Sequence, residues 1–138
     1  MRKDILIAGA LFLTPFILPA QTSDYKVVFD LTSKDSLDHK SVIRWLNEVS
    51  RMNPEAKLEV VMYGQGFNMV TKDRTVVADA ITTLAANKNI SFKVCAVALK
   101  NNNVDKSQLL PGVETVPDGI YEIISKQKEG WGYIKAVH

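Results

Sequence analysis

Short apolar runs that alternate with helix-like patterns dominate this sequence and limit the folds open to it. Five runs have the length and composition of strands, at residues 25–31, 58–63, 90–95, 113–116 and 131–135. Between them, apolar residues recur with helical spacing at 42–49, 76–85 and 120–124. Strands that alternate with helices favour βαβ units with right-handed crossovers. The sequence therefore predicts a three-layer α/β/α sandwich around a mostly parallel sheet of about five strands.

The boundaries of the predicted helices carry their own signals. The polar residues 32–36 are suited to cap the first helix, and Asn53 with the following proline ends it. Asp73 or Thr75 is the expected cap of the second helix, and Asp118 is the expected cap of the last. We also expect a short helix within residues 104–110.

Residues 1–20 have the features of a secretory signal peptide. A positive start precedes an apolar stretch at 5–18, and small residues lead into the polar segment that follows. We expect cleavage after Ala20, which leaves one domain at 25–138 in the bacterial periplasm or outside the cell. Contact with a membrane is expected only if the leader stays uncleaved, and that stretch is shorter than the ~20 residues that span a bilayer.

Charge and cysteine content exclude several classes of protein. The chain carries 17 basic and 15 acidic residues, so it is close to neutral and has no Lys/Arg block of the kind that tracks nucleic acid. Its one cysteine cannot form an internal disulfide. One cysteine and two histidines without ligand spacing do not predict a zinc site. We therefore expect no nucleic-acid partner and no metal.

Cys95 ends the third apolar run, where a buried strand is expected to give way to a loop. Ligands of open α/β sheets bind in the crevice outside the carboxyl ends of the strands, so a thiol there is a candidate reactive group. The alternative is structural, because free cysteine is among the most buried residue types. Both interpretations stay open from the residues alone.

The strand ends at residues 30–36, 63–68 and 95–100 and the turn at 117–118 are expected to share this crevice. Gly64, Gln65 and Gly66 follow the second strand, and either a tight turn or an anion cradle explains the two glycines. Lys100 and Asn101 follow the cysteine strand; the lysine either stabilises a thiolate or is an ordinary solvated side chain.

His39 lies in the first turn of the first helix. There it could pair with the thiol, or it could be an ordinary solvated residue. The glycines lack the third glycine and the downstream acid of a dinucleotide fingerprint, and the sequence has no phosphate-binding GK[ST] loop and no hydrolase elbow. No cofactor is therefore expected.

Four segments together resemble the DsrE/DsrF family of small sulfur-relay proteins. They are residues 60–66 (VVMYGQG), 92–100 (FKVCAVALK), 109–114 (LLPGVE) and 130–134 (GWGYI). The similarity extends over nearly the whole mature chain and is greatest to the exported or uncharacterised branch of the family. In sulfur-relay members, a cysteine at the end of this strand carries a persulfide between partners, in trimers or hexamers of similar subunits. The resemblance thus implies a sulfur carrier or sulfurtransferase-like protein that uses Cys95.

Two hypotheses of different classes follow. In the first, the protein binds or relays sulfur through Cys95, with a small sulfur species or a partner cysteine as its counterpart. In the second, it is a non-catalytic oligomeric binding module in which Cys95 is buried packing. A homo-oligomer is expected in either case, because Trp45, Phe67, Met69 and Trp131 could leave apolar surface uncovered in so small a domain. The alternative is that these side chains, Trp45 above all, belong to the core.

Overall fold

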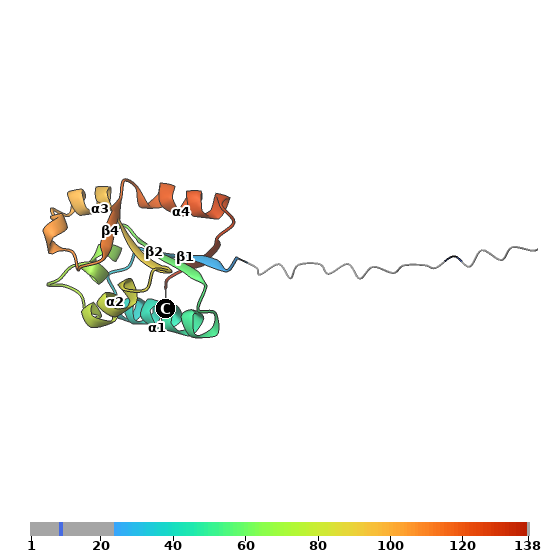
Figure 1. Ribbon diagram of the computed structural model, residues 1–138. Coiled ribbons are helices and arrows are strands. Elements are labelled where there is room, and N and C mark those ends of the chain that lie inside the picture. Colours follow the sequence, from blue (N-terminus) through green and yellow to red (C-terminus); the bar gives the residue numbers. More distant parts are fainter. Residues whose placement is uncertain (1–8, 10–23, 138) are drawn as a thin grey trace, which may run out of the picture.

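The computed structural model describes residue 9 and residues 24–137, and it folds around one five-stranded parallel sheet. The strands lie in the order β4-β3-β2-β1-β5. Figure 1 shows α1 and α2 on one face of the sheet and α3 and α4 on the other. The elements in chain order are β1 (Lys26–Leu31), α1 (Ser36–Met52), β2 (Lys57–Met62), η1 (Gly66–Val70), α2 (Ala78–Ala85), β3 (Ile90–Cys95), α3 (Ala96–Asn101), η2 (Lys106–Gln108), β4 (Val113–Val116), α4 (Gly119–Lys128) and β5 (Gly132–Lys135). The predicted three-layer architecture is confirmed.

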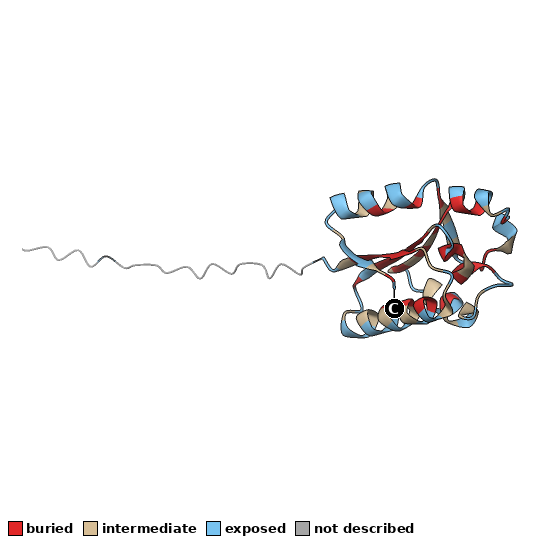
Figure 2. Ribbon diagram, turned by 180° about the vertical axis from the view of Figure 1, so that it is seen from behind, coloured by how far each residue is buried: buried red, intermediate tan, exposed pale blue. Residues whose placement is uncertain are grey.

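The larger core lies between the sheet and the helices α1 and α2. Alternate residues of β1 and β2, among them Phe29 and Val60, are fully buried on this face. Trp45 of α1 is half-buried and stacks on Phe29, with ring centroids 6.3 Å apart. Figure 2 shows buried residues along the sheet and on the helix faces turned toward it.

The opposite face of the sheet is more polar and is covered mainly by α4. Its apolar cluster comprises Val28, Val61 and Ile123, with half-buried Tyr63 and Trp131 packed against it. The acidic side chains of Asp30 and Glu59 are buried on the same strands. Because side chains alternate along a strand, these acids lie on the α4 side of the sheet. Charged groups are therefore built into this layer.

Several helix ends match the sequence signals. Asp35 caps α1 by accepting a hydrogen bond from the Leu37 amide, and α1 ends at Met52 with Asn53 as its C-cap. Asp118 caps α4 by accepting from the Tyr121 amide at 2.8 Å, as predicted.

The second helix begins later than predicted, and neither Asp73 nor Thr75 is its N-cap. Residues 66–70 form the 3₁₀ helix η1, after which the amides of Arg74 and Thr75 both donate to the Thr71 carbonyl in a turn. The Thr75 hydroxyl accepts from the Val77 amide and so stabilises this turn instead of a helix start. The short helix expected at 104–110 is likewise reduced to the 3₁₀ turn η2.

The expectation that Phe67 and Met69 leave apolar surface uncovered is wrong. Both side chains are fully buried, because η1 turns them into the larger core, and Arg74 lies over the Phe67 ring at 5.3 Å. The exposed apolar side chains lie elsewhere, and Val97, Ile120 and Ile124 are among them.

The predicted leader, residues 1–20, lies outside the described residues except for Gly9, so its cleavage stays a prediction. Within the part of the chain that is described, every helix is too short or too polar to cross a bilayer.

Candidate functional site

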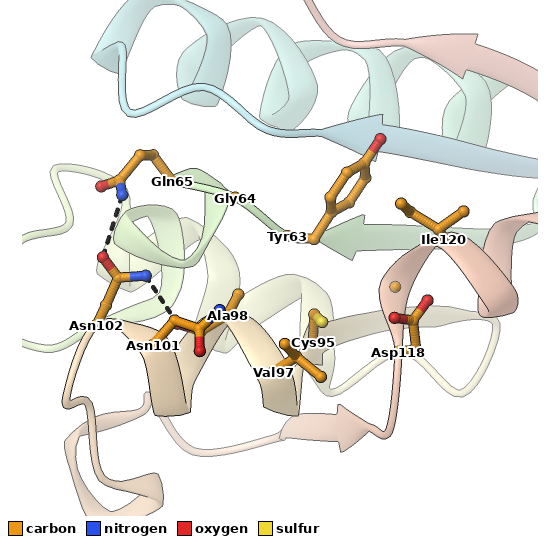
Figure 3. Close-up of a pocket in the computed structure, with 11 residues that line it drawn as sticks. Tyr63, Gly64, Gln65, Cys95, Val97, Ala98, Asn101, Asn102, Asp118 and Ile120 are labelled. Atoms are coloured by element: carbon orange, nitrogen blue, oxygen red, sulfur yellow. Dashed lines mark hydrogen bonds between the residues drawn. The ribbon is translucent and has the colours of Figure 1, made fainter.

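A pocket of about 270 Å³ lies at the carboxyl end of the sheet, where three connections meet (Figure 3). One wall is the loop after β2, the second is α3, and the third is the start of α4. The lining residues are Tyr63, Gly64, Gln65, Cys95, Val97, Ala98, Asn101, Asn102, Asp118, Gly119 and Ile120. The carboxyl ends of parallel strands are the expected place for a ligand site in this architecture.

Cys95 lies in this pocket as the last residue of β3 and the N-cap residue of α3. The expected loop after the strand is thus replaced by a helix that starts at once, at Ala96. The thiol is free and only 5% of the residue is exposed. It packs closely against α4, because a Cβ built on Gly119 would lie 3.3 Å from Cys95 Cβ and 3.0 Å from Tyr63 Cβ. Glycine at 119 therefore lets the start of α4 approach Cys95 and Tyr63 closely.

The two glycines after β2 are required by the backbone. Gly64 has φ +56°, in the left-handed region that favours glycine. Gly66 is buried, and a Cβ there would lie 2.2 Å from the Leu31 carbonyl oxygen. Gly64 and Gln65 line the pocket, whereas Gly66 shapes the turn and does not reach it. Gly66 thus allows its backbone to lie close to the end of β1, and a tight turn is the role that the structure gives to these glycines.

Amide side chains connect two walls of the pocket. Gln65 Nε2 donates to Asn102 Oδ1 at 3.1 Å, and Asn102 Nδ2 donates to the Ala98 carbonyl at 2.8 Å (Figure 3). Asn101 lies beside them in the lining, as predicted. These bonds hold the loop after β2 against α3.

Two predicted site residues lie elsewhere. Lys100 is exposed near the end of α3 and does not line the pocket. His39 is also outside the lining, and it is buried instead of solvated, with Nε2 2.9 Å from the Ser33 carbonyl oxygen. That hydrogen bond ties the ring to the loop before α1, so His39 serves the local structure there.

A polar cluster that residue spacing did not predict lies behind the pocket wall. Buried Asp30 accepts hydrogen bonds from Tyr63 at 3.3 Å, from Lys135 at 2.9 Å and from Tyr133. The bond to Asp30 is the main cause that raises the pKa of Tyr133 to about 12, and burial adds to it. Burial and then the Asp30 charge raise the pKa of Tyr63. One sign of this cluster is present in the sequence, because Asp30 is an acidic residue within the otherwise apolar end of β1.

A second buried acid, Glu59, lies beneath α4. Its Oε2 accepts from Ser91 Oγ at 3.2 Å and lies 3.5 Å from Lys126 Nζ, while Oε1 has no hydrogen-bond partner among the described residues. Burial, followed by hydrogen bonding with Glu122, raises the pKa of Glu59 to about 7, against the opposing charge of Lys126. The Glu59 carboxyl is thus a titratable group beneath α4, and the first turn of α4 borders the pocket.

The described residues contain no group of three His, Cys, Asp or Glu side chains placed to hold a metal ion. The chemistry that the pocket can supply therefore rests on the thiol of Cys95, the carboxylate of Asp118 and uncharged donors and acceptors such as Asn101. Tyr63, Asp118, Gly119 and Ile120 were not predicted as site residues, although the segments around 63 and 118 were expected at this edge. Only strand order brings them to Cys95.

Comparison with known proteins identifies relatives in sequence and structure. The DsrE/DsrF-like family matches residues 26–136. A protein of unknown function, MTH1491 from Methanobacterium thermoautotrophicum, is 28% identical with a TM-score of 0.76, over 81% of this chain and 99% of that chain. The ychN protein from E. coli is 12% identical with a TM-score of 0.68, over 81% and 98% of the two chains. BT1422 from Bacteroides thetaiotaomicron, of unknown function, is 14% identical with a TM-score of 0.60, over 84% and 98%. No curated protein sequence matches.

Proposed function

Because the chain belongs to the DsrE/DsrF-like family, we propose that it binds or relays sulfur as a persulfide on Cys95. One observation carries the proposal. The single cysteine of the sequence lines a pocket at the carboxyl edge of a parallel sheet, in the position that the family resemblance assigns to the sulfur-carrying thiol.

The proposed transfer is an exchange between sulfur atoms. The Cys95 thiolate attacks the terminal sulfur of a donor hydropersulfide, R–S–SH; a new sulfur–sulfur bond forms as the donor bond breaks, and the donor leaves as the thiolate R–S⁻. Cys95 then carries –S–SH. An acceptor thiolate attacks that terminal sulfur, and the Cys95 thiolate is released. No net oxidation or reduction occurs, so no cofactor is needed.

The depth of Cys95 supports a second candidate, a binding module in which the cysteine is packing. The residue is 5% exposed and belongs to the larger core cluster. Free cysteine often behaves as a small buried hydrophobe. The two functions differ in one property, because a carrier thiol must react in the folded protein and a packing thiol must wait for unfolding.

Sulfur loading separates the two candidates. The purified protein is incubated with a small hydropersulfide donor and its intact mass is measured. A carrier gains one sulfur atom, whereas Cys95→Ser gains none while keeping the same urea unfolding transition. The carrier proposal is wrong if the wild type takes up no sulfur when folded, or if Cys95→Ser takes up as much. Alkylation only after unfolding supports the packing role.

We also propose that a second copy covers the apolar surface formed by α3 and α4 beside the pocket, as expected for a trimer or hexamer. Val97 and Ile120, which line the pocket, are 47% and 54% exposed, and Ile124, further along α4, is 47% exposed. Ile124→Gln is expected to lower the mass seen by analytical ultracentrifugation, whereas Val76→Gln, which changes a 58% exposed side chain before α2, is not. A monomeric wild type contradicts this assembly.

Export of the mature chain to the periplasm or outside the cell is likewise proposed, on the sequence of residues 1–20. Cell fractionation together with the intact mass of the recovered protein tests it. A full-length cytoplasmic product contradicts it.

A further inference from the structure

The charges that line the Cys95 pocket are unevenly distributed. Among the described lining residues, the ionisable side chains are Tyr63, Cys95 and Asp118, and no Lys, Arg or His is present. Burial and the neighbouring Asp30 raise the pKa of Tyr63, so its phenol is neutral at physiological pH. Asp118 is therefore the residue that brings a fixed charge to the lining, and this charge is negative.

The carboxylate of Asp118 is held in place by its role as a helix cap. Oδ1 accepts from the Tyr121 amide at 2.8 Å, which keeps the side chain at the first turn of α4. The next residue, Gly119, approaches Cys95 so closely that an added Cβ would lie 3.3 Å from Cys95 Cβ. Asp118 and Cys95 line the same pocket (Figure 3).

Nearby cations do not neutralise this charge within the lining. Lys100 is exposed near the end of α3 and lies outside the lining. Lys135 lies 5.6 Å from the centre of the Tyr63 ring, but its Nζ is bound to Asp30 at 2.9 Å and to Thr32 at 3.1 Å. A negatively charged group that enters the pocket is therefore repelled by the Asp118 carboxylate and finds no basic side chain in the lining with which to pair.

The remaining lining is small and largely uncharged. Val97, Ala98 and Ile120 supply apolar surface, and the amides of Asn101 and Asn102 supply neutral polar atoms. The volume of about 270 Å³ is below the ~300–1,000 Å³ of pockets that hold drug-sized ligands. The pocket is therefore suited to a short organic group, or to the tip of a partner's side chain.

We propose that Asp118 is a specificity-determining residue that selects among the sulfur donors that reach Cys95. It favours donors with an uncharged or cationic organic group and disfavours donors that carry a carboxylate or sulfonate. This inference rests on the proposed function of Cys95. The cause is Coulomb repulsion between the Asp118 carboxylate and a second anion in the pocket. Asp118 is exposed, so water and salt screen the repulsion to an effect of about three- to fivefold.

Two alkylating reagents of similar size but different charge test the proposal. The rate of Cys95 alkylation by neutral iodoacetamide and by anionic iodoacetate is measured on the whole protein by intact mass. For each protein, the iodoacetamide rate is divided by the iodoacetate rate. This ratio is then divided by the same ratio for that protein unfolded in urea, which removes the difference in intrinsic reactivity between the two reagents. Asp118→Asn removes the charge and keeps an oxygen that can cap α4. Asp79→Asn makes the same change in the first turn of α2, away from the pocket.

The wild type and Asp79→Asn are expected to prefer iodoacetamide about three- to fivefold, less so at high salt, and Asp118→Asn is expected to lose this preference. Equal rates with both reagents in the wild type, or a preference that survives in Asp118→Asn, overturn the role of Asp118 and leave the carrier function standing. A folded protein that reacts with neither reagent overturns the carrier function, and this inference with it.

Discussion

Burial of Glu59 under α4 predicts that the protein loses stability as the pH rises toward 8. Glu59 is 3% exposed, and its Oε1 is buried without a hydrogen-bond partner among the described residues. Burial raises the pKa of this carboxyl from 4.5 to about 7, hydrogen bonding with Glu122 adds to the rise, and Lys126 opposes it. The folded protein therefore holds a proton that the unfolded chain releases at lower pH.

Proton linkage gives the direction and the size of this change in stability. Between pH 4.5 and about 7 the folded state binds more protons than the unfolded state, so the free energy of unfolding falls as the pH rises and stays reduced above the folded pKa. Each pKa unit is worth about 1.4 kcal/mol, so a rise from 4.5 to about 7 sets an upper bound of about 3.5 kcal/mol. Water near the partly exposed Lys126 screens the site, so we expect about 2 kcal/mol.

Urea unfolding between pH 5 and pH 8, followed by tryptophan fluorescence, measures this loss. Glu59→Gln cannot ionise, so it is expected to lose about 2 kcal/mol less than the wild type over this range. Glu55→Gln changes an exposed glutamate and is expected to follow the wild type. The reasoning is refuted if Glu59→Gln and the wild type lose stability equally, because the pH dependence then comes from other groups.

Three further changes test the geometry around the pocket. Gly66→Ala brings a methyl group 2.2 Å from a carbonyl oxygen of β1 and is expected to cost about 3 kcal/mol in urea unfolding; a cost below about 1 kcal/mol contradicts the close approach. Asp30→Asn removes the main cause of the high pKa of Tyr133, so that pKa is expected to fall toward 10 in an ultraviolet titration, and an unchanged value contradicts the assigned bond. Gly119→Ala fills space 3.3 Å from Cys95 Cβ and is expected to slow alkylation of the folded protein several-fold; an equal rate shows that reagents enter elsewhere.

The strands and most helix ends could be predicted because local residue patterns control them. Buried parallel strands read as continuous apolar runs, and residues 113–116 form a strand with the predicted bounds. Asp118 was predicted as a cap because aspartate is a preferred N-cap residue, and its carboxylate does accept a hydrogen bond from the Tyr121 amide. The place of Cys95 at the carboxyl edge follows from its position at the end of an apolar run.

Other features depended on contacts that a local pattern does not contain. Phe67 and Met69 were expected to leave apolar surface uncovered, but η1 turns them into the core. His39 looked solvated in a first helical turn, yet the loop before α1 folds back and its Ser33 carbonyl meets the ring. Each outcome is set by where the loop lies against the rest of the protein, so residue spacing could not predict it.

Residue types and their spacing were sufficient for the α/β class, the parallel sheet and a thiol at its carboxyl edge, because burial and capping act over a few residues. The segments around Tyr63 and Asp118 were expected near Cys95, but only the folded chain sets Gly119 against Cys95 and joins Asp30 to Tyr133 across 103 residues of sequence. The physical reason is the strand order β4-β3-β2-β1-β5. Neighbours across a sheet are chosen by the packing of all its strands and helices together, which no single segment encodes.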